Sequence, residues 1–129
     1  MVEFALVLPV LLLVLLAILK FGLLFENYLT LTDAVRAGAR TFAIGRGTAN
    51  ACTPAIAQVK ASAGSLNQVS LSVPTPVQGA GLTSPDTCTS LTSGNAVTIS
   101  ATYPCNLSIM GVNFAPSCSL SASATERVE

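Results

Sequence analysis

An unbroken apolar segment near the start of the chain limits what it can fold into. The sixteen positions 4–19 carry only apolar side chains, and the apolar character continues past Lys20 as far as Phe25. At about 1.5 Å of rise per helical residue, the first stretch is about 24 Å long and the extended one about 33 Å. A hydrocarbon core is about 30 Å thick, so we expect this segment to lie in a membrane or in a protein environment that replaces one.

The chain from Gly47 onward has a different composition. It is rich in Ser, Thr, Ala and Gly and contains all four cysteines. Its only charged residues are Lys60, Asp86, Glu126, Arg127 and Glu129. A segment of this size can form one small domain with a thin core, which disulfides would help to stabilise. We therefore expect a helical region, 1–46, followed by an extracellular head domain, 47–129.

The composition also argues against several classes of function. The formal net charge is zero and charged residues make up 9% of the chain, so no basic stripe is available and we expect no nucleic-acid partner. The cysteines form no CxxC pair and histidine is absent, so we expect disulfides rather than a metal or cofactor site. A nucleophile would have no evident base, and the isolated Asp86 in a polar loop is expected to be solvated. We expect a chain that is not an enzyme.

The distribution of cations raises a question of topology. Lys20, Arg36, Arg40 and Arg46 all follow the apolar segment, and no cation precedes it. Because cations near a span normally stay in the cytoplasm, this pattern alone would leave the cysteines in a reducing compartment. We expect that a basic leader preceded Met1 and was removed, which places the cysteines outside the cell.

The absence of turn signals predicts one helix over residues 2–44, ended by Gly45-Arg46-Gly47 and interrupted by Pro9 and Gly22. In its second half the spacing predicts a shared apolar face. The residues of that face are Leu31, Ala34, Val35, Gly38 and Phe42. Ala34 and Gly38 lie four residues apart, a spacing that lets another helix approach closely.

The head is predicted to be α+β. Thr53 as cap and Pro54 in the first turn predict a short helix that ends near Gly64. Alternating apolar positions predict three strands, at 69–73, 97–103 and 120–124, which we expect to form an antiparallel sheet. Loops are expected at about 75–95 and 104–117.

Specific motifs connect the chain to a known family. The N-terminal motif is Val2-Glu3-Phe4-Ala5-Leu6, followed by Pro9, a leucine run, Phe21-Gly22 and the stretch 34–40. Near the end, 97–104 and 120–127 are alternating stretches. These features resemble the TadE-like pilins and pseudopilins of tight-adherence systems, which are relatives of type IV pilins. The N-terminal match covers about forty residues, and the head is only loosely similar.

The resemblance implies processing by a prepilin peptidase and association with pilus assembly machinery. In that family a glutamate usually stands fifth in the mature chain, whereas the matching Glu3 stands third here. Lys20 occupies a position where the family often has an acidic residue. Four cysteines allow three pairings; family-like layout and loop closure favour Cys52 with Cys88 and Cys105 with Cys118. Asn106 begins a glycosylation sequon.

Two charged residues in the apolar region have alternative interpretations. In a packed bundle an ionised Glu3 needs a cation, such as a neighbouring chain's terminal amine, and this pairing would set the axial register. The alternative is that Glu3 only flanks the membrane surface. Lys20 either extends to the membrane interface or, in an assembly, pairs with Glu26 of another copy.

The resemblance implies a structural subunit of an extracellular, type IV-pilus-like filament that serves adhesion or surface attachment. The subunit would polymerise as a homo-oligomer through its N-terminal helices and reside in the cytoplasmic membrane before assembly. Two alternatives remain at this point: a minor pseudopilin of the assembly machine that stays in the membrane, and a single-pass membrane-anchored module whose head binds a surface or ligand.

Overall fold

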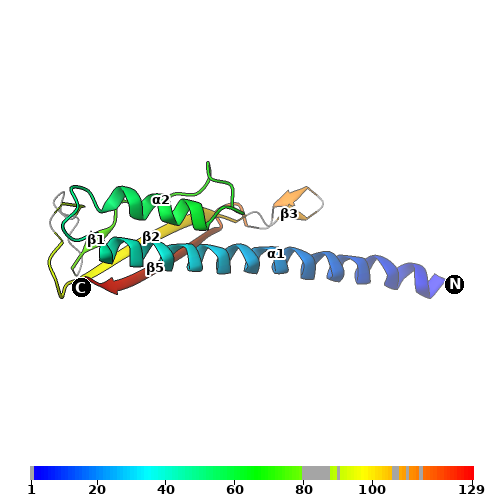
Figure 1. Ribbon diagram of the computed structural model, residues 1–129. Coiled ribbons are helices and arrows are strands. Elements are labelled where there is room, and N and C mark those ends of the chain that lie inside the picture. The colour runs from blue at the N-terminus through cyan, green and yellow to red at the C-terminus, as the bar shows by residue number, and fades with distance from the viewer. Residues whose placement is uncertain (1, 80–87, 90, 106–107, 110, 114) are drawn as a thin grey trace.

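The computed structural model describes residues 2–79, 88–89, 91–105, 108–109, 111–113 and 115–129; for residues 2, 3, 5, 108, 109 and 112 it describes the backbone alone. A long helix, α1 (Val2–Ile44), carries a small head on its C-terminal part and projects from it at the N-terminal end (Figure 1). The other elements are α2 (Cys52–Ser62), β1 (Val77–Gln78), β2 (Ala96–Pro104), β3 (Ser108–Ile109), β4 (Val112–Asn113) and β5 (Ser119–Arg127). The α+β class is confirmed.

Helix α1 has the expected bounds and runs without interruption through Pro9 and Gly22. Its 43 residues correspond to about 65 Å of helix. The helix ends where the Gly45 N–H donates to the Phe42 carbonyl at 3.0 Å, and Gly47 follows with a φ of +84°. This left-handed conformation is easily adopted only by glycine, which explains why the predicted stop signal ends the helix here.

Strands β1, β2 and β5 form an antiparallel sheet in the order β1-β2-β5. The long pair β2 and β5 is in continuous register, with Ile99 opposite Ala124 and Ala101 opposite Ala122. Val97, Ile99 and Ala101 are fully buried, so one face of β2 forms the floor of the core. Strands β3 and β4 pair separately as a small hairpin.

The strand expected at 69–73 is not formed, and that prediction was wrong. Asn67 collects the backbone donors of this stretch: its carbonyl accepts from the Ser70 and Leu71 N–H groups, and its Oδ1 accepts from the Val69 N–H. Only Ser72 reaches the sheet, through an isolated bridge to Thr102. The turn chemistry of asparagine therefore overrides the alternating apolar pattern. The third strand of the sheet is β1, inside the expected 75–95 loop, and the β3–β4 hairpin lies inside the expected 104–117 loop.

The start of α2 also differs from the prediction. The helix begins at Cys52, and the Oδ1 atom of Asn50 accepts from the Cys52 and Thr53 N–H groups at 3.1 and 3.2 Å. Thr53 is thus inside the first turn rather than at the cap. Pro54 does occupy the first turn, where its missing N–H costs no helical hydrogen bond. The helix ends at Ser62, two residues before the expected end.

The second half of α1 belongs to the core of the head. The predicted face is buried, with Leu31, Ala34, Val35 and Phe42 fully inaccessible. A Cβ atom added to Gly38 would overlap Val59 Cγ2 and lie 3.2 Å from the Ala55 carbonyl oxygen. The helix that approaches Gly38 closely is therefore α2 of the same chain.

Two disulfides tie the connecting segments to this core. They join Cys52 to Cys88 and Cys105 to Cys118, the pairs that the family resemblance implied, with Cα–Cα distances of 5.1 and 5.2 Å. The first anchors the start of α2, where the Ala51 N–H also donates to the Cys88 carbonyl at 2.8 Å. The second closes the segment that contains the β3–β4 hairpin.

Substituting Gly38 by alanine is predicted to destabilise the head by about 1–3 kcal/mol, because the added methyl group overlaps α2. Gly22→Ala is the matched control: nothing lies within 4 Å of its added Cβ, so the change should be neutral or slightly stabilising. Urea unfolding of the detergent-solubilised chain, monitored by tyrosine fluorescence, measures the stability of both variants. Equal stability of the two variants would contradict the packing described here.

The two disulfides should differ in their contribution to stability. Their Cys residues are 36 and 13 positions apart, for which loop closure predicts losses of about 4 kcal/mol for the Cys52→Ser/Cys88→Ser variant and about 3 kcal/mol for the Cys105→Ser/Cys118→Ser variant. The difference should widen because Cys52 belongs to the hydrophobic core cluster and Cys88 packs against it, whereas Cys105 and Cys118 do neither. The denaturant midpoints of the two double variants test this prediction. A larger loss of stability in the Cys105→Ser/Cys118→Ser variant would contradict it.

Candidate functional site: the uncovered half of the long helix

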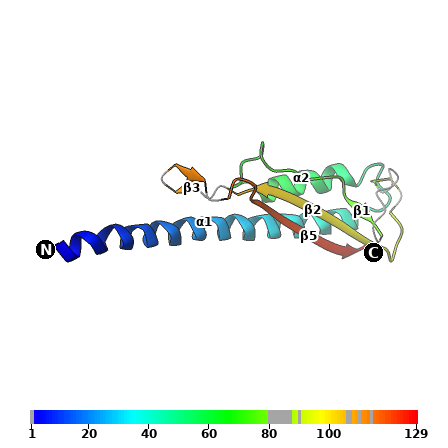
Figure 2. The same ribbon diagram turned by 180° about the vertical axis from the view of Figure 1, so that it is seen from behind.

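Helix α1 is divided into a covered half and an uncovered half. Both ribbon views show the head packed along its C-terminal part, while the N-terminal part extends beyond α2 and the β1-β2-β5 sheet (Figures 1 and 2). Most large apolar side chains of the uncovered half, from Phe4 to Phe25, are exposed. They are Phe4, Leu6, Val7, Leu8, Val10, Leu11, Leu12, Leu13, Val14, Leu15, Ile18, Leu19, Phe21, Leu23 and Phe25.

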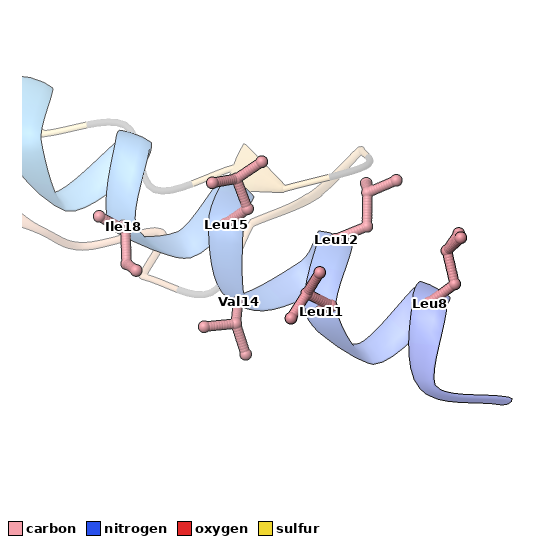
Figure 3. Close-up of a pocket in the computed structure, with 6 residues that line it drawn as sticks. All are labelled: Leu8, Leu11, Leu12, Val14, Leu15 and Ile18. Carbon is pink, nitrogen blue, oxygen red and sulfur yellow. The ribbon is translucent and has the colours of Figure 1, made fainter. Parts of the chain in front are cut away.

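A shallow apolar groove runs over this half. Its lining residues are Leu8, Leu11, Leu12, Val14, Leu15 and Ile18, all from α1 (Figure 3). Because a single helix supplies every wall, the groove is a surface relief rather than an enclosed ligand cavity. Such a surface suits acyl chains or the ridges of another helix, which pack into it without polar partners.

The uncovered half matches the thickness of a membrane. Among the described residues one helix is long and apolar enough to cross a bilayer, and its most apolar 18-residue window has no buried residue. The twenty positions 4–23 span about 30 Å, which equals a typical hydrocarbon core. The head therefore begins along α1 close to where a membrane would end.

A small polar niche marks this boundary. Lys20, Leu23, Leu24 and Asn27 line it from α1, and Tyr103 and Pro104 line it from the end of β2. Lys20 is half-buried, and the residues that precede it in α1 are apolar. In both views the β3–β4 hairpin lies beyond the end of β2, alongside the N-terminal part of α1 (Figures 1 and 2). The niche is thus the only described place where a charged side chain of the apolar segment meets the head.

Apart from Glu3, the remaining charges of α1 lie on the head side of the niche. Arg36 pairs with Asp33, three residues before it in the helix, at 4.0 Å, but both side chains are largely exposed and such pairs contribute little. Arg40 lines a surface hollow together with Glu126 and Glu129 at the far end of the head. These charges face water beside the core and leave the N-terminal surface apolar.

The structure places the remaining sequence-predicted residues as follows. Pro9 and Gly22 are exposed on the uncovered half, and nothing lies within 4 Å of a Cβ built on Gly22. The side chain of Glu3 and all of Asn106 lie outside the described residues, and so does Asp86. The niche was missed by sequence reasoning, because no pattern links Lys20 to Tyr103 across more than eighty residues.

An arginine placed on the uncovered half should impair membrane insertion without unfolding the head. Leu12→Arg is predicted to cost about 2.5–3.5 kcal/mol at the centre of the bilayer, which is about a hundredfold shift toward the soluble fraction. Ile44→Arg is the matched control, because Ile44 is also an exposed apolar residue of α1 but lies at the opposite end of the helix. Alkaline carbonate extraction of membranes measures both, and equal extraction of the two variants would contradict the assignment.

Comparison with known proteins concerns the N-terminal part of the chain. Residues 1–40 match the family of TadE-like proteins. No curated protein and no solved structure matches the chain. The matched region covers the whole uncovered half of α1 and most of its covered half, whereas α2 and the sheet lie outside it. The similarity to TadE-like proteins therefore concerns residues 1–40 of the chain.

Proposed function

We propose that the chain is a structural, non-enzymatic subunit of an extracellular, type IV-pilus-like (tight-adherence) filament. The observation that carries this proposal is the uncovered half of α1: fifteen large apolar side chains between Phe4 and Phe25 are exposed, although the same helix is already packed in a folded head. A monomer in water would expose far more contiguous apolar surface than soluble proteins tolerate. The uncovered half therefore needs a permanent apolar neighbour.

Copies of the same helix can provide that neighbour. Each large apolar side chain removed from water contributes about 1.5–3 kcal/mol, so a filament core made of these helices would be held together strongly outside the cell. Transfer of the helix from lipid to such a core gains little from the exclusion of water, because acyl chains are as apolar as leucine. The preference of the helix for other copies over lipid then rests on close packing between helices. The heads would form the outer wall of the filament.

The subunit would reside in the cytoplasmic membrane before assembly, with its head outside the cytoplasm. The disulfides support this orientation, because they persist in oxidising compartments. The family match over residues 1–40 supports the involvement of a prepilin peptidase and of pilus assembly machinery. Within the filament we assign Glu3 the role of fixing the axial register by pairing with a cation of the neighbouring copy.

Analysis of sheared surface appendages tests the proposal. We expect the chain to be the abundant component of filaments with helical symmetry, identified by imaging together with mass spectrometry of its intact N-terminus. Recovery of the chain only as a trace component would favour the minor pseudopilin. Recovery only from membranes, as a dispersed species, would favour the membrane-anchored module and overturn the proposal.

Glu3→Ala is predicted to leave membrane insertion intact and to lower polymer yield severalfold, because an axial register set by a charge pair is lost. Glu129→Ala removes a carboxylate from the exposed C-terminus and is the control. Quantifying the chain in sheared and membrane fractions measures both effects. Polymer yield equal to that of the control would refute the register role of Glu3.

A further inference from the structure

The boundary niche has the chemistry of an anion site. It combines the ammonium group of Lys20 with the side-chain amide of Asn27, and Leu23, Leu24 and Pro104 supply apolar walls. Tyr103 also lines the niche, and its hydroxyl is held in place because it accepts from the Asn67 N–H at 3.4 Å. Two side chains with N–H donors therefore line one niche together with apolar residues.

Among the residues that the structure describes, the Lys20 ammonium has no counter-ion. Lys20 is half-buried, and the only ion pair within 4.0 Å among the described residues joins Asp33 and Arg36. Partial burial of an ammonium group is costly unless an anion or several acceptors replace its hydration. The niche thus lacks a negative group that would complete it.

The position of the niche identifies which negative groups are near. If positions 4–23 span the hydrocarbon core, Lys20 lies about 4.5 Å below its outer edge, within reach of the headgroups through its flexible stem. Tyrosine is typical of this interfacial level, and Tyr103 is brought there by the head rather than by the helix. Phosphates of the outer leaflet are available at this level before any second copy arrives.

We propose that the niche binds the phosphate group of an anionic phospholipid in the outer leaflet. The Lys20 ammonium pairs with the phosphate, the Asn27 amide donates to one of its oxygens, and Leu23, Leu24 and Pro104 contact the adjoining apolar part of the lipid. This contact joins the head to the membrane surface and fixes the depth of α1. The inference rests on the membrane residence included in the proposed function, and it does not require polymerisation.

Native mass spectrometry of the full chain in detergent tests the site with defined probes. With phosphatidylglycerol and phosphatidylcholine of identical acyl chains, we expect about a fivefold preference for phosphatidylglycerol, since one lysine near an anionic surface contributes about 1 kcal/mol. Lys20→Gln should abolish the preference and Lys20→Arg should retain it. Lys60→Gln removes an exposed lysine of α2 and should leave the preference unchanged. Equal retention of both lipids by the wild-type chain, or an unchanged preference in Lys20→Gln, would overturn the proposal.

Two further arms separate the lipid from other anions. Inorganic phosphate in excess should not displace phosphatidylglycerol, because it lacks the apolar contacts; displacement would show a site for free phosphate instead. Carbodiimide cross-linking in membranes should not join Lys20 to a carboxylate of a second copy, and such a product would assign the niche to subunit pairing. A chain that shows the lipid preference but never forms filaments would refute the filament proposal alone.

Discussion

The packing of α2 and the β2–β5 pair onto the second half of α1 is the interaction on which the rest of the structure depends. Phe42, Leu31 and Val35 are fully buried there, and Gly38 lets α2 approach the helix backbone. The head has no helix of comparable length of its own, so it folds around part of the element that also forms the stalk. The direction of the uncovered half is consequently fixed relative to the head.

This shared helix makes the small head possible. Apart from α1, the head offers one 11-residue helix and a sheet with two long strands, which provide few large apolar side chains. The largest buried residue of the described core, Phe42, belongs to α1. The two disulfides join Cys88 to the start of α2 and close the segment between Cys105 and Cys118. A thin core of this kind is expected to depend on covalent cross-links. The fold can therefore present a long apolar rod and remain stable at one end of it.

Much of this architecture could be predicted from the sequence because its signals are local. The bounds of α1 followed from a continuous helical pattern and a Gly45–Gly47 stop, and strands β2 and β5 from period-two alternation. The errors also have local causes. Asn67 accepts backbone N–H groups through its carbonyl and its Oδ1, which makes a turn of the 69–73 stretch. Asn50 accepts through its Oδ1 alone, which moves the start of α2. The niche at Lys20 could not be foreseen, because only the folded chain brings Tyr103 to that level of the helix.

The most direct test of the central claim asks what surrounds the uncovered half in each state. A spin label introduced through Leu12→Cys, at an exposed position far from the head, would report on this surface in membranes and in native surface material. The account predicts an isolated spin with lipid-like oxygen accessibility in dilute membranes, and strong dipolar coupling between copies with loss of that accessibility in filaments. An isolated, lipid-exposed spin in both materials would contradict it.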